Sequence, residues 1–409
     1  MRVLLFTGKG GVGKTTSAAA TAAHAARCGV KTLVLSTDAA HSLADVLGTA
    51  LGPVPVEVEP GLFAQQVDAR SRAQRSWRAV QGHLVGVLDS LGVDRLEAEE
   101  LTDLPGAQEV LALLEVRDHV EQGPWDLLVV DCAPTAETLR LLAVPEALAR
   151  MVERLLPAER RVMRALAGSA RPLLGGRGAA ALPSRDHMVE AAERLHAELA
   201  SVRAVLSAPT TTVRLVLTPE SAAVAEALRT WTTLSLYGHV VDGVVVNRVF
   251  AAGDAHGEVD AWRAGWARAQ ERWLGEIYDG FAGVPIRTLG YADSEPIGVD
   301  AVADLGEALY GDPGAAGAQA LLAVTPRVPP MRVERSGQEF VLVLDLPLAR
   351  REELDLARRG DELVICLGSR RRTIALPSAL RRCVVVGASL RDGRLRVRFE
   401  PDPDLWRPL

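Results

Sequence analysis

A glycine-rich loop with two lysines follows the first apolar segment of the chain. Residues 2–7 form a strand-like run, which precedes Gly8-Lys9-Gly10-Gly11-Val12-Gly13-Lys14-Thr15-Thr16 and then an alanine-rich helical pattern. The spacing Gly-x-x-x-x-Gly-Lys-Thr between a strand and a helix is that of a phosphate-binding loop. Backbone N–H groups of such a loop converge on phosphates, beside the positive end of the helix dipole. The sequence therefore predicts an ATP site at residues 8–16.

Two lysines and a threonine carry the charge and metal chemistry expected of this loop. Lys14 is expected to neutralise the β- and γ-phosphates, and Thr15 is expected to ligate Mg²⁺. Only three of the 46 basic residues are lysine, namely Lys9, Lys14 and Lys31. A bias so strong toward arginine retains lysine where a fork-shaped guanidinium would fail. Two of the three lysines lie in the loop, which supports catalytic roles for Lys9 and Lys14.

Apolar runs predict the sheet that would position this loop. They occur at about 2–7, 32–36, 126–131, 213–218, 240–246 and 284–288, and each is followed by a helical pattern. This alternation predicts an α/β fold with a doubly wound, mostly parallel P-loop NTPase sheet and helices on both faces. Ligands of such sheets bind at the carboxyl ends of the strands.

The 409 residues exceed what one core usually organises, so a second domain is expected. Residues 1–310 are interpreted as the ATPase domain. Within it, 146–207 reads as a helical subdomain, to which helices from 69–121 contribute. The apolar residues of these helices suit either an ordinary core or a surface that holds an apolar protein client.

The pattern changes near residue 311. Residues 311–330 are rich in glycine and proline and are interpreted as a linker. Beyond it the apolar period becomes two, with short strands predicted at 339–347, 362–367, 372–377 and 394–399. Residues 331–409 are therefore expected to form a small C-terminal all-β sandwich.

Charge and composition exclude several classes of function. The net charge of −6 gives no reason to expect nucleic-acid binding or an anionic membrane surface. No apolar run reaches the roughly 18 residues of a membrane span, and the loop comes too early for a signal peptide. The four cysteines are scattered and show no metal-ligand spacing. We expect a cytoplasmic protein without an integral membrane segment.

Two aspartates at the ends of predicted strands are candidates for metal and water chemistry. Asp131 ends the apolar run 126–131, where a carboxylate suits Mg²⁺ held through water. Asp38 follows the second predicted strand, within Ser36-Thr37-Asp38-Ala39-Ala40-His41. Residues at such positions also cap the helix that follows, which is the structural alternative for Asp38.

Taken together, these segments resemble the arsenite-pump and tail-anchored-protein-targeting ATPases over residues 1–310. A lysine directly after the first glycine, as at Lys9, marks their deviant phosphate-binding loop. The segment 36–45 is similar to their first switch, normally Asp-Pro-Ala-His, with Ala39 in place of proline. The segment 127–142 is similar to their second switch and departs from it at Cys132, Ala136 and Glu137.

The resemblance implies roles for further residues. Asp38 would orient the attacking water and join Thr15 and Asp131 around Mg²⁺. Lys9 would reach the phosphates of a second copy, which implies a homodimer. Glu220 would lie near nucleotide across the dimer interface, and Asn247, the only asparagine, would read the adenine edge. Pro285, with residues 295–298, would belong to the loop that closes over the base.

The C-terminal region has a resemblance of its own. Residues 388–395, Ala-Ser-Leu-Arg-Asp-Gly-Arg-Leu, fit the A-x-x-x-x-G-x-L element of α-crystallin (small heat-shock) domains. A generic β-sandwich docking module is the alternative.

Three functions are compatible with these resemblances. The first is a Mg²⁺-dependent ATPase whose homodimer opens and closes with nucleotide to handle an apolar protein client. The second is an arsenite- or anion-transporting ATPase subunit, although arsenite-binding relatives use clustered cysteines that this chain lacks. The third is a nucleotide-gated positioning scaffold, whose septum-positioning relatives end in an amphipathic membrane helix that is absent here.

Overall fold

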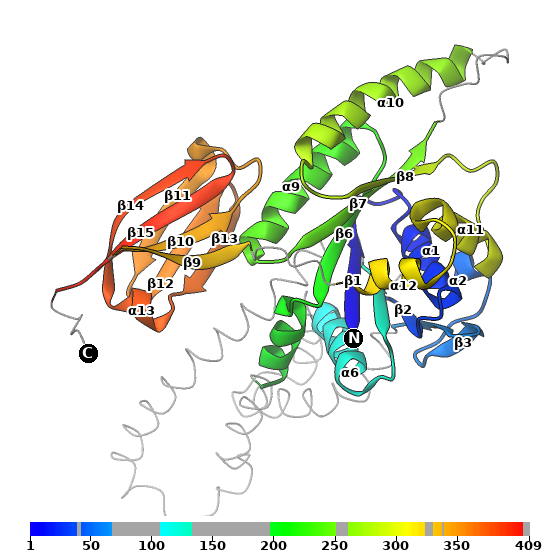
Figure 1. Cartoon of the computed structure of the whole chain (residues 1–409), viewed down its shortest axis with the longest axis horizontal. Helices are drawn as coiled ribbons and strands as arrows, with labels where there is room; N and C mark the ends of the chain where they lie inside the picture. The colour runs from blue at the N-terminus through cyan, green and yellow to red at the C-terminus, as the bar shows by residue number, and fades with distance from the viewer. Residues whose placement is uncertain are drawn as a thin grey trace, which may run out of the picture.

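The computed structural model describes residues 1–38, 42–67, 107–132, 197–250, 261–323, 330–337 and 339–403. An eight-stranded sheet lies at the centre of the N-terminal part (Figure 1). Its strands are β1 (Arg2–Thr7), β2 (Thr32–Ser36), β3 (Val56–Glu59), β4 (Leu62–Gln66), β5 (Leu127–Asp131), β6 (Thr211–Leu217), β7 (Val241–Val249) and β8 (Ile286–Gly290).

The strand order is β3-β4-β2-β5-β1-β6-β7-β8, and all neighbours are parallel except the pair β3 and β4. The predicted doubly wound, mostly parallel α/β fold is therefore confirmed. All six predicted strands are present. Strands β3 and β4 were not predicted from the sequence. Strand β3 is a short, polar edge strand with no buried apolar run to mark it.

Helices cover both faces of this sheet. Figure 1 shows α1, α2 and α11 on one side of the sheet and α9 on the other. The helices of this part are α1 (Lys14–Arg27), α2 (Ser42–Leu47), α6 (Ala107–Gln122), α9 (Ser221–Tyr237), α10 (Ala261–Gly280), α11 (Val299–Tyr310) and α12 (Ala315–Leu322). Residues 197–207 are also helical.

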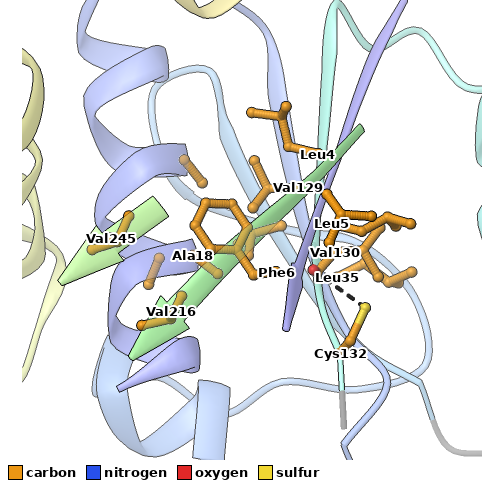
Figure 2. Close-up of a cluster of buried hydrophobic side chains, with 14 of the residues drawn as sticks. Leu4, Leu5, Phe6, Ala18, Leu35, Val129, Val130, Cys132, Val216 and Val245 are labelled. Atoms are coloured by element: carbon orange, nitrogen blue, oxygen red, sulfur yellow. Dashed lines mark hydrogen bonds between the residues drawn. The ribbon is translucent and has the colours of Figure 1, made fainter. Parts of the chain in front are cut away.

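The core explains the continuous apolar runs of the sequence. Figure 2 shows Phe6 of β1 among side chains from neighbouring strands and from α1, including Val129, Val216 and Ala18. Each of these four residues is at most 1% exposed, because the sheet is covered on both faces. Full burial of one such aliphatic or aromatic side chain contributes about 1.5–3 kcal/mol. The core thus fixes the carboxyl end of β1, from which the glycine-rich loop starts.

The C-terminal part forms two antiparallel sheets around a separate core, as predicted. The sheets have the orders β14-β15-β10-β9 and β11-β12-β13. Their strands are β9 (Met331–Ser336), β10 (Glu339–Asp345), β11 (Leu354–Arg359), β12 (Glu362–Leu367), β13 (Arg370–Ala375), β14 (Cys383–Arg391) and β15 (Arg394–Pro401), with short helices η3 (Arg351–Glu353) and α13 (Ser378–Arg381).

The segment interpreted as a linker differs from the expectation over part of its length. Residues 315–322 form α12, which packs on the large core through Leu321, 2% exposed. Glycines flank and interrupt this short segment, so its helical signal is weak in the sequence.

Helix α9 joins the two parts. Its residue Leu236 is fully buried in the core of the C-terminal sheets. The guanidinium of Arg372 on β13 donates to the backbone carbonyl of Leu236, and the hydroxyl of Thr232 donates to that of Pro347. The C-terminal sheets are therefore docked on the end of α9 through buried contacts.

Most of the predicted helical subdomain lies outside the described residues. Of the segments 69–121 and 146–207, the structure describes only 107–121 and 197–207. Within the described ranges, no helix is both long enough and apolar enough to cross a membrane.

Candidate functional site

Close backbone packing requires glycine at two positions of the phosphate-binding loop. A Cβ atom at Gly8 would lie 2.1 Å from the carbonyl oxygen of Val216, which is closer than atoms can approach. Gly13 has φ +92°, and a Cβ atom there would lie 2.2 Å from the Nδ2 atom of Asn247. A tight glycine loop at a helix N-terminus is the backbone arrangement that a phosphate cradle requires.

The two lysines of the loop lie in different environments. Lys14 opens α1, is 6% exposed, and its Nζ atom donates to the carbonyl oxygen of Lys9 at 3.3 Å. The side chain of Lys9 is exposed, like Gly10 and Gly11 beside it. Lys14 is thus held over its own loop, whereas Lys9 is exposed to solvent.

A buried carboxylate lies directly beneath the loop. The hydroxyl of Thr15 donates to Asp131 Oδ2 at 2.8 Å, and the hydroxyl of Ser36 donates to the same oxygen at 3.2 Å. Ser42, the first residue of α2, lies 3.2 Å from the Thr15 hydroxyl. Three separate elements, α1, β2 and α2, therefore bring hydroxyl groups to the surroundings of one carboxylate at the end of β5.

Burial dominates the electrostatics of Asp131. This residue is fully buried, and burial raises the pKa of its carboxyl to about 6, although the Thr15 hydrogen bond and the charge of Lys14 oppose the rise. Within the described residues, its second oxygen, Oδ1, has no hydrogen-bond partner. A buried, unpaired acceptor is unfavourable unless a ligand uses it.

The side chains present fit a nucleotide with a hydrated magnesium ion. Magnesium prefers oxygen ligands and keeps several of its waters. The Thr15 hydroxyl would supply an oxygen ligand, and Asp131 Oδ1, which has no partner among the described residues, would accept a hydrogen bond from a metal-bound water. Lys14 and the loop N–H groups supply the positive surface that phosphates need.

Asp38 lies beside this carboxylate. Its backbone N–H donates to Ser36 Oγ at 3.3 Å, and its carbonyl oxygen accepts a 2.7 Å bond from Gln66 Nε2. The preceding residue, Thr37, donates its N–H to the carbonyl oxygen of Asp131 at 2.9 Å. The backbone of Asp38 is therefore anchored next to the end of β5. The rest of the predicted first switch, residues 39–41, lies outside the described residues.

Asn247 reaches the loop from the end of β7. Its Nδ2 atom donates to the carbonyl oxygen of Val12 at 2.9 Å, and its Oδ1 atom accepts from the N–H of Arg248. Its predicted contact with adenine stays a prediction. Thr16, on the first turn of α1, is half-buried. Glu220 is exposed and directly precedes α9 at the carboxyl edge of the sheet.

The position of Pro285 contradicts its predicted contact with the base. Pro285 precedes β8, and its carbonyl oxygen accepts the N–H of Val244 on β7. Asn247 lies three residues further along β7, which corresponds to about 10 Å. Pro285 therefore lies toward the amino ends of the strands, away from the loop, and its assignment is wrong. Residues 295–298 follow β8 and lie on its carboxyl side.

Several polar residues of the site were missed in the sequence. Ser36, Ser42 and Gln66 contact Asp131, Thr15 or Asp38, and Ser36 pairs in register with Gln66 on the neighbouring strand. The available signal was a polar residue at the carboxyl end of a buried strand, since such ends line the site.

Cys132 follows Asp131 at the end of β5. It is 2% exposed and donates its thiol to the carbonyl oxygen of Val130 (Figure 2). Burial raises the pKa of this thiol, which favours a packed apolar side chain over a reactive thiolate. Residues 133–142 of the predicted second switch lie outside the described residues.

Comparison with known proteins identifies both parts of the chain. The family model described as anion-transporting ATPase matches residues 1–311, and that of an HSP20-like domain found in ArsA matches residues 337–399. Both predicted resemblances are thereby confirmed.

Relatives match over nearly the whole chain. An uncharacterized protein of Streptomyces coelicolor is 44% identical over 99% of both chains. A Mycobacterium tuberculosis protein is 35% identical over 99% of this chain and 97% of its own. A Chlorobaculum tepidum protein, provisionally named an arsenical pump-driving ATPase, is 34% identical over 98% of this chain and 96% of its own. The chain belongs to the family of anion-transporting ATPases.

Proposed function

We propose that the protein is a Mg²⁺-dependent ATPase whose homodimer opens and closes with nucleotide to handle an apolar protein client. The observation that carries the proposal is the bond from Thr15 to the buried Asp131, whose second oxygen has no partner among the described residues. This pair lies beneath a glycine-rich loop at the start of a helix, where a nucleotide phosphate and its metal ion would bind.

The loop residues bind and orient the nucleotide in this proposal. The N–H groups of residues 8–16 hold the phosphates, and Lys14 neutralises charge on them. Thr15 and Asp131 hold the metal site, with Asp38 beside them. When bound, magnesium would neutralise charge that develops on the transferred phosphoryl group.

Asp38 is assigned to orient the attacking water. Its backbone is fixed beside Asp131, so its side chain starts from a defined position next to the metal site. Replacement Asp38→Asn is expected to preserve ATP binding and to abolish turnover, because the amide cannot accept a proton from water. Asp45, exposed on α2, offers a matched control, and Asp45→Asn should leave turnover within twofold. Unchanged turnover in Asp38→Asn would remove Asp38 from this role.

The homodimer proposal rests on the exposed lysine. The Nζ atom of Lys14 is held over its own loop by the Lys9 carbonyl oxygen, whereas the Lys9 side chain is exposed. Glu220 is exposed at the same carboxyl edge. Two copies that meet at this edge would each place Lys9 near the phosphates of the other copy, so ATP would favour the closed dimer.

The proposal also covers the handling of a client. It assigns the segments 69–121 and 146–207, which the sequence predicts to be helical, to an apolar client such as the membrane anchor of a tail-anchored protein. A labelled apolar helical peptide of about 20 residues, the length of a membrane span, provides the test by fluorescence anisotropy. Its affinity should differ at least fivefold between ATP- and ADP-loaded protein, and equal affinities would contradict nucleotide-gated handling.

Arsenite transport is the second candidate, because the Chlorobaculum relative carries the name of an arsenical pump-driving ATPase. The cysteines do not favour it. Cys28 follows the last residue of α1, whereas Cys132 lies near the site at which α1 begins. The 14 residues of α1 separate these ends by roughly 21 Å. A severalfold rise in ATPase rate with arsenite would reverse the ranking.

A further inference from the structure

Two adjacent glutamines end strand β4, and both are buried. Gln65 is 1% exposed and Gln66 is 2% exposed. Successive side chains of a strand point to opposite faces of the sheet, so the two amides serve different neighbours. Gln66 pairs in register with Ser36 of β2, which places it next to the segment that carries Asp38.

Gln66 donates a hydrogen bond to the backbone of Asp38. Its Nε2 atom lies 2.7 Å from the Asp38 carbonyl oxygen. Only the amide nitrogen can face a carbonyl oxygen favourably, so the orientation of this side chain is determined by its partner. On the other side of the same residue, the N–H of Asp38 donates to Ser36 Oγ. The Asp38 backbone is therefore held from two strands.

The oxygen of the Gln66 amide lies in a different environment from its nitrogen. Its Oε1 atom is buried and has no hydrogen-bond partner within the described part of the chain. An apolar side chain of the same length would remove this acceptor, but it would also leave the Asp38 carbonyl oxygen without the Gln66 donor. The amide nitrogen, which donates to Asp38, is therefore the part of Gln66 whose contribution the structure shows.

Gln65 shows the opposite pattern. Its Nε2 atom donates to the carbonyl oxygen of Pro53 at 2.8 Å and to Glu115 Oε1 at 2.9 Å. Its Oε1 atom lies 2.6 Å from His119 Nε2. Both partners Glu115 and His119 belong to α6, so Gln65 fastens the end of β4 to that helix. Both polar atoms of the Gln65 amide therefore contribute hydrogen bonds that stabilise the fold.

We propose that Gln66 is a positioning residue for ATP hydrolysis, which acts by holding the backbone of Asp38. The proposal rests on the role assigned to Asp38 above. A carboxylate that orients water must be placed to within a fraction of an ångström, and a shift of about 1 Å can lower a rate a hundredfold. The Gln66 bond restrains that shift.

Two neighbouring variants of the full-length protein test the proposal. Gln66→Met should lower kcat by roughly tenfold, with KM for ATP within twofold of wild type and a melting temperature lowered less than in Gln65→Met, because one hydrogen bond is lost instead of three. Gln65→Met, the matched control, should lower the melting temperature, because it leaves partners on α6 and at Pro53 unsatisfied. Its kcat per folded molecule should stay within twofold of wild type. An unchanged kcat in Gln66→Met, a raised KM, or a fall in melting temperature as large as that of Gln65→Met would overturn the proposal.

The variant Asp38→Asn distinguishes a failure of this inference from a failure of the proposed function. If Asp38→Asn loses turnover while Gln66→Met keeps it, only the role of Gln66 fails. If Asp38→Asn keeps its turnover, the assigned role of Asp38 fails, and a slow Gln66→Met would then act by another route, which also overturns the inference. In the supporting case the double variant is no slower than Asp38→Asn alone, since both changes remove one function.

Discussion

The amide nitrogen of Asn247 lies 2.9 Å from the carbonyl oxygen of Val12, so the end of β7 is bonded to the loop that follows β1. The amide oxygen of Asn247 also accepts the N–H of Arg248, whose φ of +59° is unfavourable for a residue with a side chain. The only asparagine of the chain thus stabilises both the phosphate-binding loop and a strained backbone position.

Replacement Asn247→Ala should therefore lower the free energy of unfolding of the nucleotide-free protein by about 1–2 kcal/mol. Asn247→Asp keeps the acceptor for Arg248 but brings a negative charge to the loop, so it should weaken ATP binding more than alanine does. Chemical denaturation and nucleotide titration measure these effects. Equal ATP affinity in the aspartate variant and wild type would show that Asn247 does not lie near the phosphates.

The approach of Asn247 makes Gly13 sensitive to substitution. In Gly13→Ala the new Cβ atom meets the Asn247 amide at 2.2 Å, on a backbone with φ +92°. We expect the free energy of unfolding of this variant, measured without nucleotide, to be about 2 kcal/mol lower than that of wild type. Gly10→Ala is the control, because no atom lies within 4 Å of a Cβ at that position, and its stability should change by less than about 0.5 kcal/mol. Similar losses in the two variants would contradict this account.

The buried His239, two residues after the end of α9, should make the stability of the protein depend on pH. Burial, together with the charge of Arg372, lowers the pKa of its imidazole to about 4, although a bond to the Leu206 backbone opposes this. In the unfolded chain, the His239 imidazole takes up a proton near the ordinary histidine pKa of about 6.5, whereas in the folded chain it does not. Stability from this residue is therefore complete above pH 6.5 and is lost as pH falls toward 4, by up to about 3 kcal/mol.

Denaturation of wild type and His239→Gln across pH 4–8 checks this sign. The free-energy difference between the two proteins should shift against wild type as pH falls from 6.5 to 4. A difference that is constant with pH would mean that His239 titrates alike in both states.

The contact between the two parts of the chain should depend on Arg372. Its guanidinium is 5% exposed and donates to the carbonyl oxygen of Leu236. Arg372→Ala would remove this donor and leave a buried acceptor, lowering the unfolding free energy by about 2 kcal/mol. Amide exchange at residues 232–239 should become faster. Arg371, the exposed neighbour, provides the control, and Arg371→Ala should leave exchange unchanged. Protection that survives in Arg372→Ala would contradict docking through this residue.

The sequence was informative where one physical signal dominated. Parallel strands covered on both faces are continuous apolar runs, so β1, β2 and β5 to β8 were predicted, and the order strand, glycine loop, helix predicted the phosphate site. Asp131 was found because a carboxylate at the end of a buried strand is costly unless a ligand or a partner uses its charge. These features depend on local sequence alone.

Other features depend on contacts between distant segments. Gln66 and Arg372 look like ordinary surface residues in a single sequence, and only the fold brings them to Asp38 and Leu236. Pro285 was misplaced because its position relative to β8 decides which edge of the sheet it occupies, and the predicted strand began two residues early. The edge strand β3 was missed because it is polar and short.

The central claim is that ATP closes two copies of the chain through the exposed Lys9. Separate variants of Lys9 and Lys14 distinguish the roles of these two lysines. Lys9→Ala should still bind ATP, because Lys14 remains over the loop, yet it should not gain the contact across the dimer. Lys14→Ala should weaken ATP binding itself.

Size-exclusion chromatography with multi-angle light scattering, with and without ATP and Mg²⁺, tests the claim most directly. The Asp38→Asn protein, which retains ATP, should shift toward twice the chain mass of 43.6 kDa when nucleotide is added, and adding Lys9→Ala should prevent the shift. A particle that stays at 43.6 kDa with saturating ATP would contradict a nucleotide-driven dimer.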